Sequence, residues 1–92
     1  MAETSQVANL NALLANMYAL LIQTQSVHWN FLGTNFFSIH KMTQSQYEDI
    51  FDAIDKIAER IRAKGHHVTT GISEYAKQTV IKEQDDTMLN AD

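Results

Sequence analysis

Proline is absent from this chain of 92 residues, and its three glycines stand at positions 33, 65 and 71. Proline and glycine are the residues least compatible with a helix interior, so two long stretches remain in which a helix can run unbroken. One stretch precedes Gly33 and the other lies between Gly33 and Gly65. This distribution favours long helices over a turn-rich β fold, and it predicts an all-α protein.

The first stretch, residues 4 to 32, has an apolar stripe at the spacing of a packed helix. The members of the stripe recur at steps of three, four or seven residues: Leu10, Leu14, Met17, Leu21 and His28. Leu13 and Leu20 widen the stripe, so we expect packing partners on more than one side of this helix. Thr4 or Ser5 is the expected cap at its start.

The second stretch predicts a helix from about residue 35 to 64, with Thr34 or Asn35 as its N-cap and Gly65 as its end. Its apolar residues again recur by threes and fours: Phe36, Phe37, Tyr47, Phe51, Ile54, Ala58 and Ile61. Cationic side chains gather in the last turns of this helix, where they complement the helix dipole.

Gly33 is expected to end the first helix in a left-handed conformation. The short turn that follows forces two helices of this length into an antiparallel hairpin. Residues 66 to 72 look irregular, and Ser73 is a candidate cap for a short helix over 73–82. We expect one domain, 1–92, whose hairpin has an incomplete core, because it has much apolar surface and no third long helix. Helices of another copy would complete this core.

The charge distribution bears on the possible partners. The chain has a net charge of −4, and all seven lysines and arginines stand at position 41 or later. No basic arm can therefore extend from the N-terminus, and nucleic-acid binding is an unfavoured interpretation. An acidic surface suits cations instead.

Three further absences narrow the class of protein. There is no cysteine, which excludes disulfides, thiolate metal sites and thiol nucleophiles, and which fits a reducing compartment. The first residues lack the features of a secretory signal, and no apolar run is long enough to cross a membrane. We therefore expect a cytoplasmic protein with no membrane partner.

Four side chains form a plausible iron-site ligand set. With the turn at Gly33, His28 and His40 should face each other at the same level of the hairpin, close to the turn. Asp55 and Glu59 follow as i, i+4 neighbours on one face of the second helix. Fifteen residues separate His40 from Asp55, which is about 22 Å of helix, whereas a metal–ligand bond is only ~2 Å. The carboxylates therefore cannot share a metal with the histidines of their own chain.

A two-fold axis resolves this conflict. Two antiparallel hairpins could place the histidines of one copy against the carboxylates of the other, which makes two equivalent sites per dimer. Glu48 and Asp52 extend the carboxylate face into a stripe on which a cation would be stabilising. Imidazole and carboxylate ligands without thiolate suit iron, manganese or zinc. Neither His28 nor His40 has a glutamate three residues before it, so neither belongs to the Glu-x-x-His motif of ferritin-like di-iron sites.

Each of these residues also has a plainer interpretation. A single histidine on an apolar stripe is more often an interface residue than a ligand, and an acidic pair is more often a solvated face. Trp29, Phe36 and Phe37 are interpreted first as core residues. The matched level of the two histidines places the metal interpretation on an equal footing with these.

At these residues the chain resembles the Dps family, the DNA-binding proteins from starved cells, also called miniferritins. The resemblance covers roughly residues 7 to 84. It rests on these segments: His28-Trp29-Asn30, Phe36-Phe37-x-x-His40, Asp55-x-x-Ala58-Glu59-Arg60-Ile61, Glu74-Tyr75 and Ile81-Lys82-Glu83. The combined spacing of twelve, fifteen and four residues between the four candidate ligands is far more specific than any one segment.

The resemblance implies a ferritin-like fold, a hollow homododecamer and a ferroxidase centre at a two-fold interface. By position, its ligands are His28, His40, Asp55 and Glu59, with Trp29 beside them to intercept radicals. The implied reaction is oxidation of Fe(II) by hydrogen peroxide or oxygen, for iron storage and protection against oxidative stress. Zinc or manganese could substitute for iron in such a site.

The chain departs from the family pattern at two positions near the second histidine. Gln44 stands where the family usually has an acidic residue, and Lys41 stands where a glutamate is common. Together they replace negative charge by a neutral amide and a cation, so a second iron ion is expected to bind weakly. The family also continues with two more long helices. The resemblance therefore implies one ferritin-like domain, 1–92, whose hairpin is half of a four-helix bundle, and this bundle is either completed by another chain or truncated.

Three functions follow in order of support. The first is a Dps-like ferroxidase at a homodimeric interface. The second is a helical hairpin that self-associates without catalysis. The third, and least supported, is a DNA-compacting protein.

Overall fold

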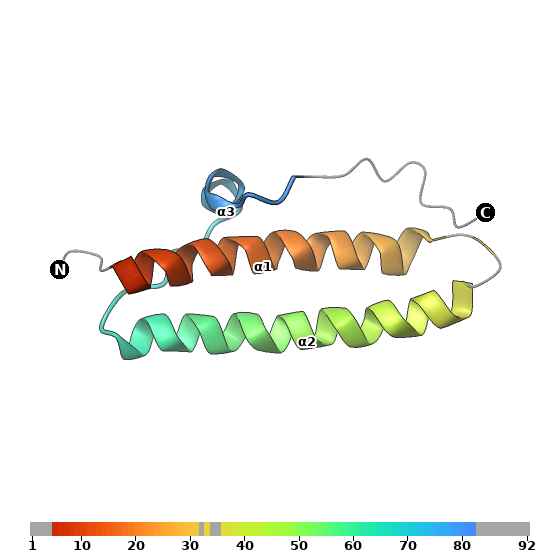
Figure 1. The fold of residues 1–92 in the computed structure, drawn as a ribbon, viewed down its shortest axis with the longest axis horizontal. Helices are drawn as coiled ribbons and strands as arrows, with labels where there is room; N and C mark the ends of the chain where they lie inside the picture. Colours follow the sequence, from red (N-terminus) through yellow and green to blue (C-terminus); the bar gives the residue numbers. More distant parts are fainter. Residues whose placement is uncertain (1–4, 32, 34–35, 83–92) are drawn as a thin grey trace.

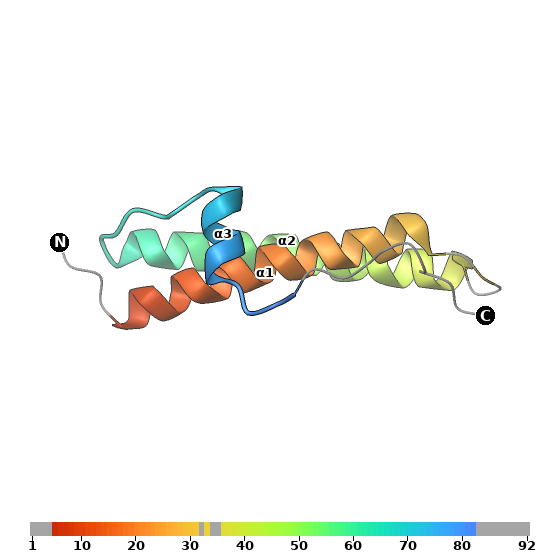
Figure 2. The same cartoon turned by 90° about the horizontal axis from the view of Figure 1, so that it is seen from above.

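The computed structural model describes residues 5–31, 33 and 36–82. It contains helices α1 (Ser5–Asn30), α2 (Phe36–Ala63) and α3 (Ile72–Gln78), and no strand in the described part. Helices α1 and α2 lie antiparallel and side by side, and α3 crosses α1 on the side away from α2 (Figures 1 and 2). The all-α helical hairpin predicted from the sequence is therefore confirmed. None of the described helices is long and apolar enough to span a membrane.

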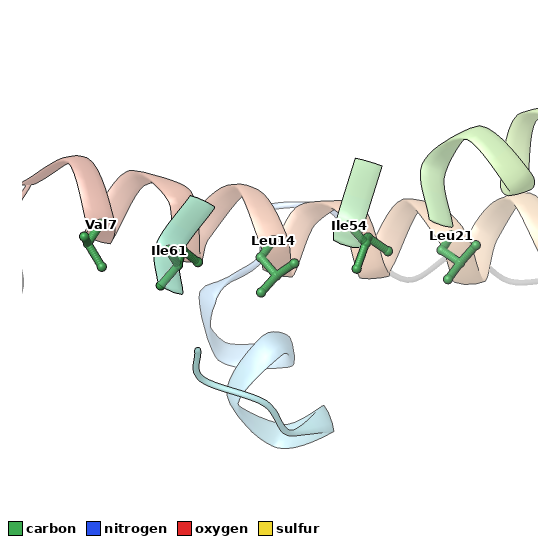
Figure 3. Packing of buried hydrophobic residues seen from close by; sticks show 5 residues of the cluster. All are labelled: Val7, Leu14, Leu21, Ile54 and Ile61. Atoms are coloured by element: carbon green, nitrogen blue, oxygen red, sulfur yellow. The ribbon is translucent and has the colours of Figure 1, made fainter. Parts of the chain in front are cut away.

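A seven-residue repeat holds α1 against α2. The buried hydrophobic side chains from the two helices alternate along their interface (Figure 3): Val7, Ile61, Leu14, Ile54 and Leu21. These residues, which form the seam of the hairpin, are seven positions apart on each helix. Because α2 runs antiparallel to α1, their numbers rise along α1 and fall along α2, and the spacing between facing residues stays constant. Such a repeat keeps one seam of each helix facing its partner along the whole hairpin. One further step of seven reaches His28 on α1, and two further steps reach His40 on α2.

Gly65 ends α2 as expected. Its φ of 83° is in the left-handed region that glycine adopts without strain. The Gly65 N–H donates to the Arg62 carbonyl at 2.9 Å, and the His66 N–H donates to the Ile61 carbonyl at 3.3 Å. These are the two hydrogen bonds of a Schellman motif, and they satisfy carbonyls that the helix end would otherwise leave unpaired.

The other end of the hairpin differs in detail from the expectation. Helix α1 ends at Asn30, so Gly33, with φ 144°, lies in the loop beyond the helix end rather than at its C-cap. The Phe31 N–H still donates to the Val27 carbonyl at 3.0 Å, which closes the last turn. Ser5 is the first residue of α1. The other candidate caps lie outside the described residues: Thr4, Thr34 and Asn35.

The third helix is shorter than the expected range 73–82. It begins at Ile72 after Gly71, so Ser73 lies inside the helix and is not its cap. It ends at Gln78 because a long-range contact holds the next residues extended. Asn16 Oδ1 on α1 accepts the Thr79 hydroxyl at 2.6 Å and the Val80 N–H at 2.9 Å. The segment after α3 is thus attached along α1.

An aromatic pair fixes α3 on α1. Tyr75 stacks on Tyr18 with 4.7 Å between the ring centroids and 15° between the ring planes. The Tyr75 hydroxyl also donates to the Thr69 carbonyl at 2.8 Å. Burial, and then the neighbouring Tyr18, raise the pKa of Tyr75 above its ordinary value. This tyrosine therefore stays neutral and keeps its hydrogen bond throughout the physiological range.

Several apolar residues expected in the core are exposed. Phe37 is 68% exposed and Phe51 is 63% exposed, and Leu13 and Leu20 are exposed as well. Each lies one or three residues from a seam position, which turns it roughly 60° to 100° away from the facing helix. The side chain of Phe36 lies outside the described residues. The helix periodicity was correct, but a two-helix hairpin covers only one side of each helix.

The seam predicts a large difference between two isoleucine substitutions. Ile61 is fully buried in it, whereas Ile72 at the start of α3 is 88% exposed. Ile61→Ala should lower the free energy of unfolding by about 2 to 5 kcal/mol, because it removes buried methyl groups and leaves a cavity. Ile72→Ala should change it by less than about 0.5 kcal/mol. Urea unfolding followed by circular dichroism measures both, and equal losses would contradict the seam described here.

Candidate metal centre

The two histidines form a reciprocal pair at the turn end of the seam. Their rings stack with centroids 3.7 Å apart and 21° between the planes. His28 Nδ1 lies 2.8 Å from the His40 carbonyl oxygen, and His40 Nδ1 lies 3.0 Å from the His28 carbonyl oxygen. Each ring therefore reaches across the hairpin to the backbone of the other residue. The expectation that the two imidazoles lie at one level is confirmed.

These contacts determine where each neutral ring carries its proton. A carbonyl oxygen can only accept a hydrogen bond, so each Nδ1 must be the protonated donor. The neutral ring then carries its lone pair on Nε2, which is the atom that can bind a metal. A backbone carbonyl that holds the other ring N–H is the usual support of a metal-binding histidine. The pair is thus chemically prepared for ligation.

Sequence reasoning missed one polar residue of this cluster. Thr43 is only 3% exposed, and its hydroxyl oxygen lies 3.0 Å from His28 Nδ1. The same hydroxyl donates to the Ile39 carbonyl at 2.7 Å. The signal available in the sequence was a threonine one turn after His40, on the side of the second helix that faces the first.

The two carboxylates form a separate half-site further along α2. Asp55 and Glu59 are both exposed. A hydrogen bond with Asp55, and then the negative charge of Asp55, raise the pKa of Glu59 above its ordinary value. The two carboxyl groups therefore lie close enough to repel each other when both are ionised. A cation bound between them would remove this repulsion.

The structure does not bring these two halves together within one chain. Asp55 follows His40 by fifteen residues of continuous helix, which is about 22 Å. Within residues 5–31, 33 and 36–82, no group of three or more His, Cys, Asp or Glu side chains could hold one metal ion. A site built from all four side chains would therefore need a second copy.

Three other residues set the surroundings of the histidine pair. Trp29 is 66% exposed, so its interpretation as a core residue is wrong for the single chain. The Lys41 ammonium lies over the ring of Phe37, 5.3 Å from its centroid, where a cation–π contact holds it. The Gln44 amide donates to the Glu48 carboxylate at 3.3 Å. A carboxylate thus lies one helical turn beyond the neutral Gln44.

The interaction between the two carboxyl groups makes a prediction for Asp55→Asn. This change removes the negative charge beside Glu59, so the pKa of Glu59 should fall toward its ordinary value. A raised pKa means that the Glu59–Asp55 interaction favours the folded state at low pH and loses that contribution as pH rises through the folded pKa. A carboxyl-carbon NMR titration measures the pKa. An unchanged Glu59 titration in Asp55→Asn, with Asp49→Asn as the matched control, would contradict the coupling.

Comparison with known proteins identifies the family. A family model for the ferritin-like domain matches residues 7–91. The DNA protection during starvation protein of Helicobacter pylori is 39% identical over 82 residues, which cover 89% of this chain and 57% of the relative. The protein of the same name from Porphyromonas gingivalis is 33% identical over 85 residues, which cover 92% of this chain and 54% of the relative. The chain thus spans little more than half the length of these relatives.

Solved structures agree with the sequence match. The Dps protein of Vibrio cholerae, described as a ferritin-like diiron-carboxylate protein, superposes with a TM-score of 0.87 at 36% identity. The match covers 94% of this chain and 54% of that one. Dps from Listeria monocytogenes gives a TM-score of 0.84 at 24% identity, covering 90% of this chain and 54% of that one, and it supports the fold alone. This chain belongs to the ferritin-like domain family, and within it to the Dps proteins.

Proposed function

We propose that two copies of this chain assemble a ferroxidase site at a two-fold interface. The observation that carries the proposal is the division of the ligand set into two prepared halves. The imidazole half has its Nδ1 atoms held by backbone carbonyls, and the carboxylate half brings together two like charges whose repulsion a cation would relieve. A two-fold axis that brings one half to the other makes two identical sites. His28 and His40 of one copy would meet Asp55 and Glu59 of the other.

The substrate of this site is Fe(II). Neutral imidazoles suit the ferrous ion, and anionic carboxylates stabilise the higher charge of the ferric ion, so the mixed ligand set favours oxidation. Two ferrous ions each give up one electron, and one hydrogen peroxide takes both electrons with two protons to leave two waters. Dioxygen is the alternative oxidant. Zinc would compete for the same ligands without being oxidised, because Zn²⁺ has no redox chemistry, and manganese would compete for these ligands as well.

The residues around the imidazole half adjust this chemistry. Lys41 and Gln44 leave the half-site poorer in negative charge, so we propose one tightly held ferrous ion and a second, weakly held one. Trp29 follows His28 directly and is exposed, which makes it available as an electron donor to radical intermediates beside the site. Its oxidation would spare other parts of the protein.

The test is oxidation of anaerobically loaded Fe(II) after addition of peroxide, followed by ferric absorbance. The wild type should oxidise Fe(II) faster than buffer, and His28→Ala and Asp55→Ala should each lose most of this rate, because each removes a ligand from every site. His67→Ala and Asp49→Ala are matched controls, since both change exposed side chains outside the ligand set, and both should keep the rate. A wild type that oxidises Fe(II) no faster than buffer would end the ferroxidase proposal.

The exposed apolar residues favour a second candidate, a self-associating hairpin without catalysis. Leu13 and Leu20 lie on one flank of the seam and Phe51 lies on the other, and all three are exposed in the single chain. Large exposed apolar side chains in such a pattern mark a surface that another helix covers. Association seen by light scattering, together with Fe(II) oxidation at the buffer rate, would select this second function.

DNA compaction remains the third function considered. Some relatives carry a name that refers to DNA protection. In this chain every lysine and arginine lies at position 41 or later, and the net charge is −4. The first forty residues therefore offer no basic arm that would support that role.

A further inference from the structure

The buried hydroxyl of Thr43 has a defined direction of hydrogen bonding. It donates its single proton to the Ile39 carbonyl at 2.7 Å, one helical turn back on α2, with the His40 carbonyl 3.2 Å away. A hydroxyl that donates to the backbone presents its lone pairs elsewhere, and here His28 Nδ1 lies 3.0 Å from the same oxygen. The hydroxyl is thus placed as an acceptor for the ring of His28.

His28 Nδ1 therefore faces two acceptors, the His40 carbonyl and the Thr43 hydroxyl. If the ring carried its proton on Nε2, the Nδ1 lone pair would point at a carbonyl oxygen only 2.8 Å away. To give this Nδ1 lone pair a donor, the Thr43 hydroxyl would have to break its hydrogen bond to the Ile39 carbonyl and turn toward the ring. The side chain is almost fully buried, so no bulk water is at hand to replace that lost bond.

We propose that Thr43 is a positioning residue that accepts from His28 Nδ1 beside the His40 carbonyl, and so helps to hold the ring in the tautomer with the proton on Nδ1. The proposal deepens the ferroxidase function and rests on it for its consequence, which is that Nε2 is the nitrogen offered to iron. The tautomer itself is a property of the metal-free chain. Of the four candidate ligands, Thr43 contacts the ring of His28 and the backbone carbonyl of His40, so it acts on how a ligand is held and not on the metal.

The chain contains its own control for this effect. The ring of His40 donates from Nδ1 to the His28 carbonyl, and Thr43 makes no described hydrogen bond to that ring. Loss of the Thr43 hydroxyl should therefore change the Nδ1–H signal of His28 more than that of His40. A general loosening of the hairpin would instead affect the two rings alike, because they are stacked.

The test compares nitrogen-15 NMR spectra of the imidazole rings in the metal-free wild type, Thr43→Val and Thr43→Ser, at a pH where the rings are neutral. The wild type should show His28 protonated on Nδ1 and unprotonated on Nε2. Thr43→Val, which keeps the shape and removes the hydroxyl, should shift the His28 Nδ1–H signal, because one of its two acceptors is lost while the His40 carbonyl remains. Thr43→Ser, which keeps the hydroxyl, should restore the wild-type pattern.

Anaerobic titration with Fe(II) alone gives the second readout. Thr43→Val should bind Fe(II) about tenfold more weakly, at the lower end of the range for a residue that supports a metal ligand, since the His40 carbonyl remains. A wild-type His28 protonated on Nε2 would overturn the proposal, and so would identical His28 spectra in wild type and Thr43→Val. If the spectra change as expected but the wild type binds no Fe(II), the ferroxidase function fails while the positioning role stands.

Discussion

The seven-residue seam between α1 and α2 sets the position of everything else in this chain. Its hydrophobic layers fix the level at which the helices face each other, and the histidine pair continues the same register toward the turn. Tyr47 belongs to that register and contacts His28 edge-on, with 5.1 Å between the ring centroids. The imidazole pair is therefore held by the packing of the hairpin as well as by its own hydrogen bonds. A slip of the seam would separate the two rings.

The same straight helix that aligns the histidines keeps them away from the carboxylates. A continuous α2 separates His40 from Asp55 by about 22 Å, and no rearrangement of side chains can shorten this. The exposed aromatic residues and the two separated half-sites thus have one explanation in common. In the proposed assembly, both are features of a surface that a second helix pair covers.

Much of this arrangement could be predicted from the sequence. The absence of proline and the glycines at 33 and 65 indicated the hairpin, and counting from the turn placed His28 opposite His40. These predictions succeed because they depend on local backbone preferences and on helix geometry, which are fixed by residue type and spacing.

Other features depend on contacts between distant residues, and the sequence did not reveal them. Periodicity marked Phe37 and Phe51 as apolar positions, but it does not say which flank of a helix has a neighbour. Helix α3 ends early because Asn16, some sixty residues away, holds the segment that follows. Thr43 was overlooked because the partner of a hydroxyl is decided by packing. The four ligands remain a proposal, since their assembly involves a second chain.

The central claim is that each site takes its imidazoles from one copy and its carboxylates from another. It is tested most directly by refolding a His28→Ala/His40→Ala chain together with a Asp55→Ala/Glu59→Ala chain. Each variant alone lacks half of every site and should oxidise Fe(II) no faster than buffer. In an equal mixture, random pairing should restore about a quarter of the wild-type sites, because only sites with both intact halves are active. A mixture as inactive as its two components would contradict the shared site.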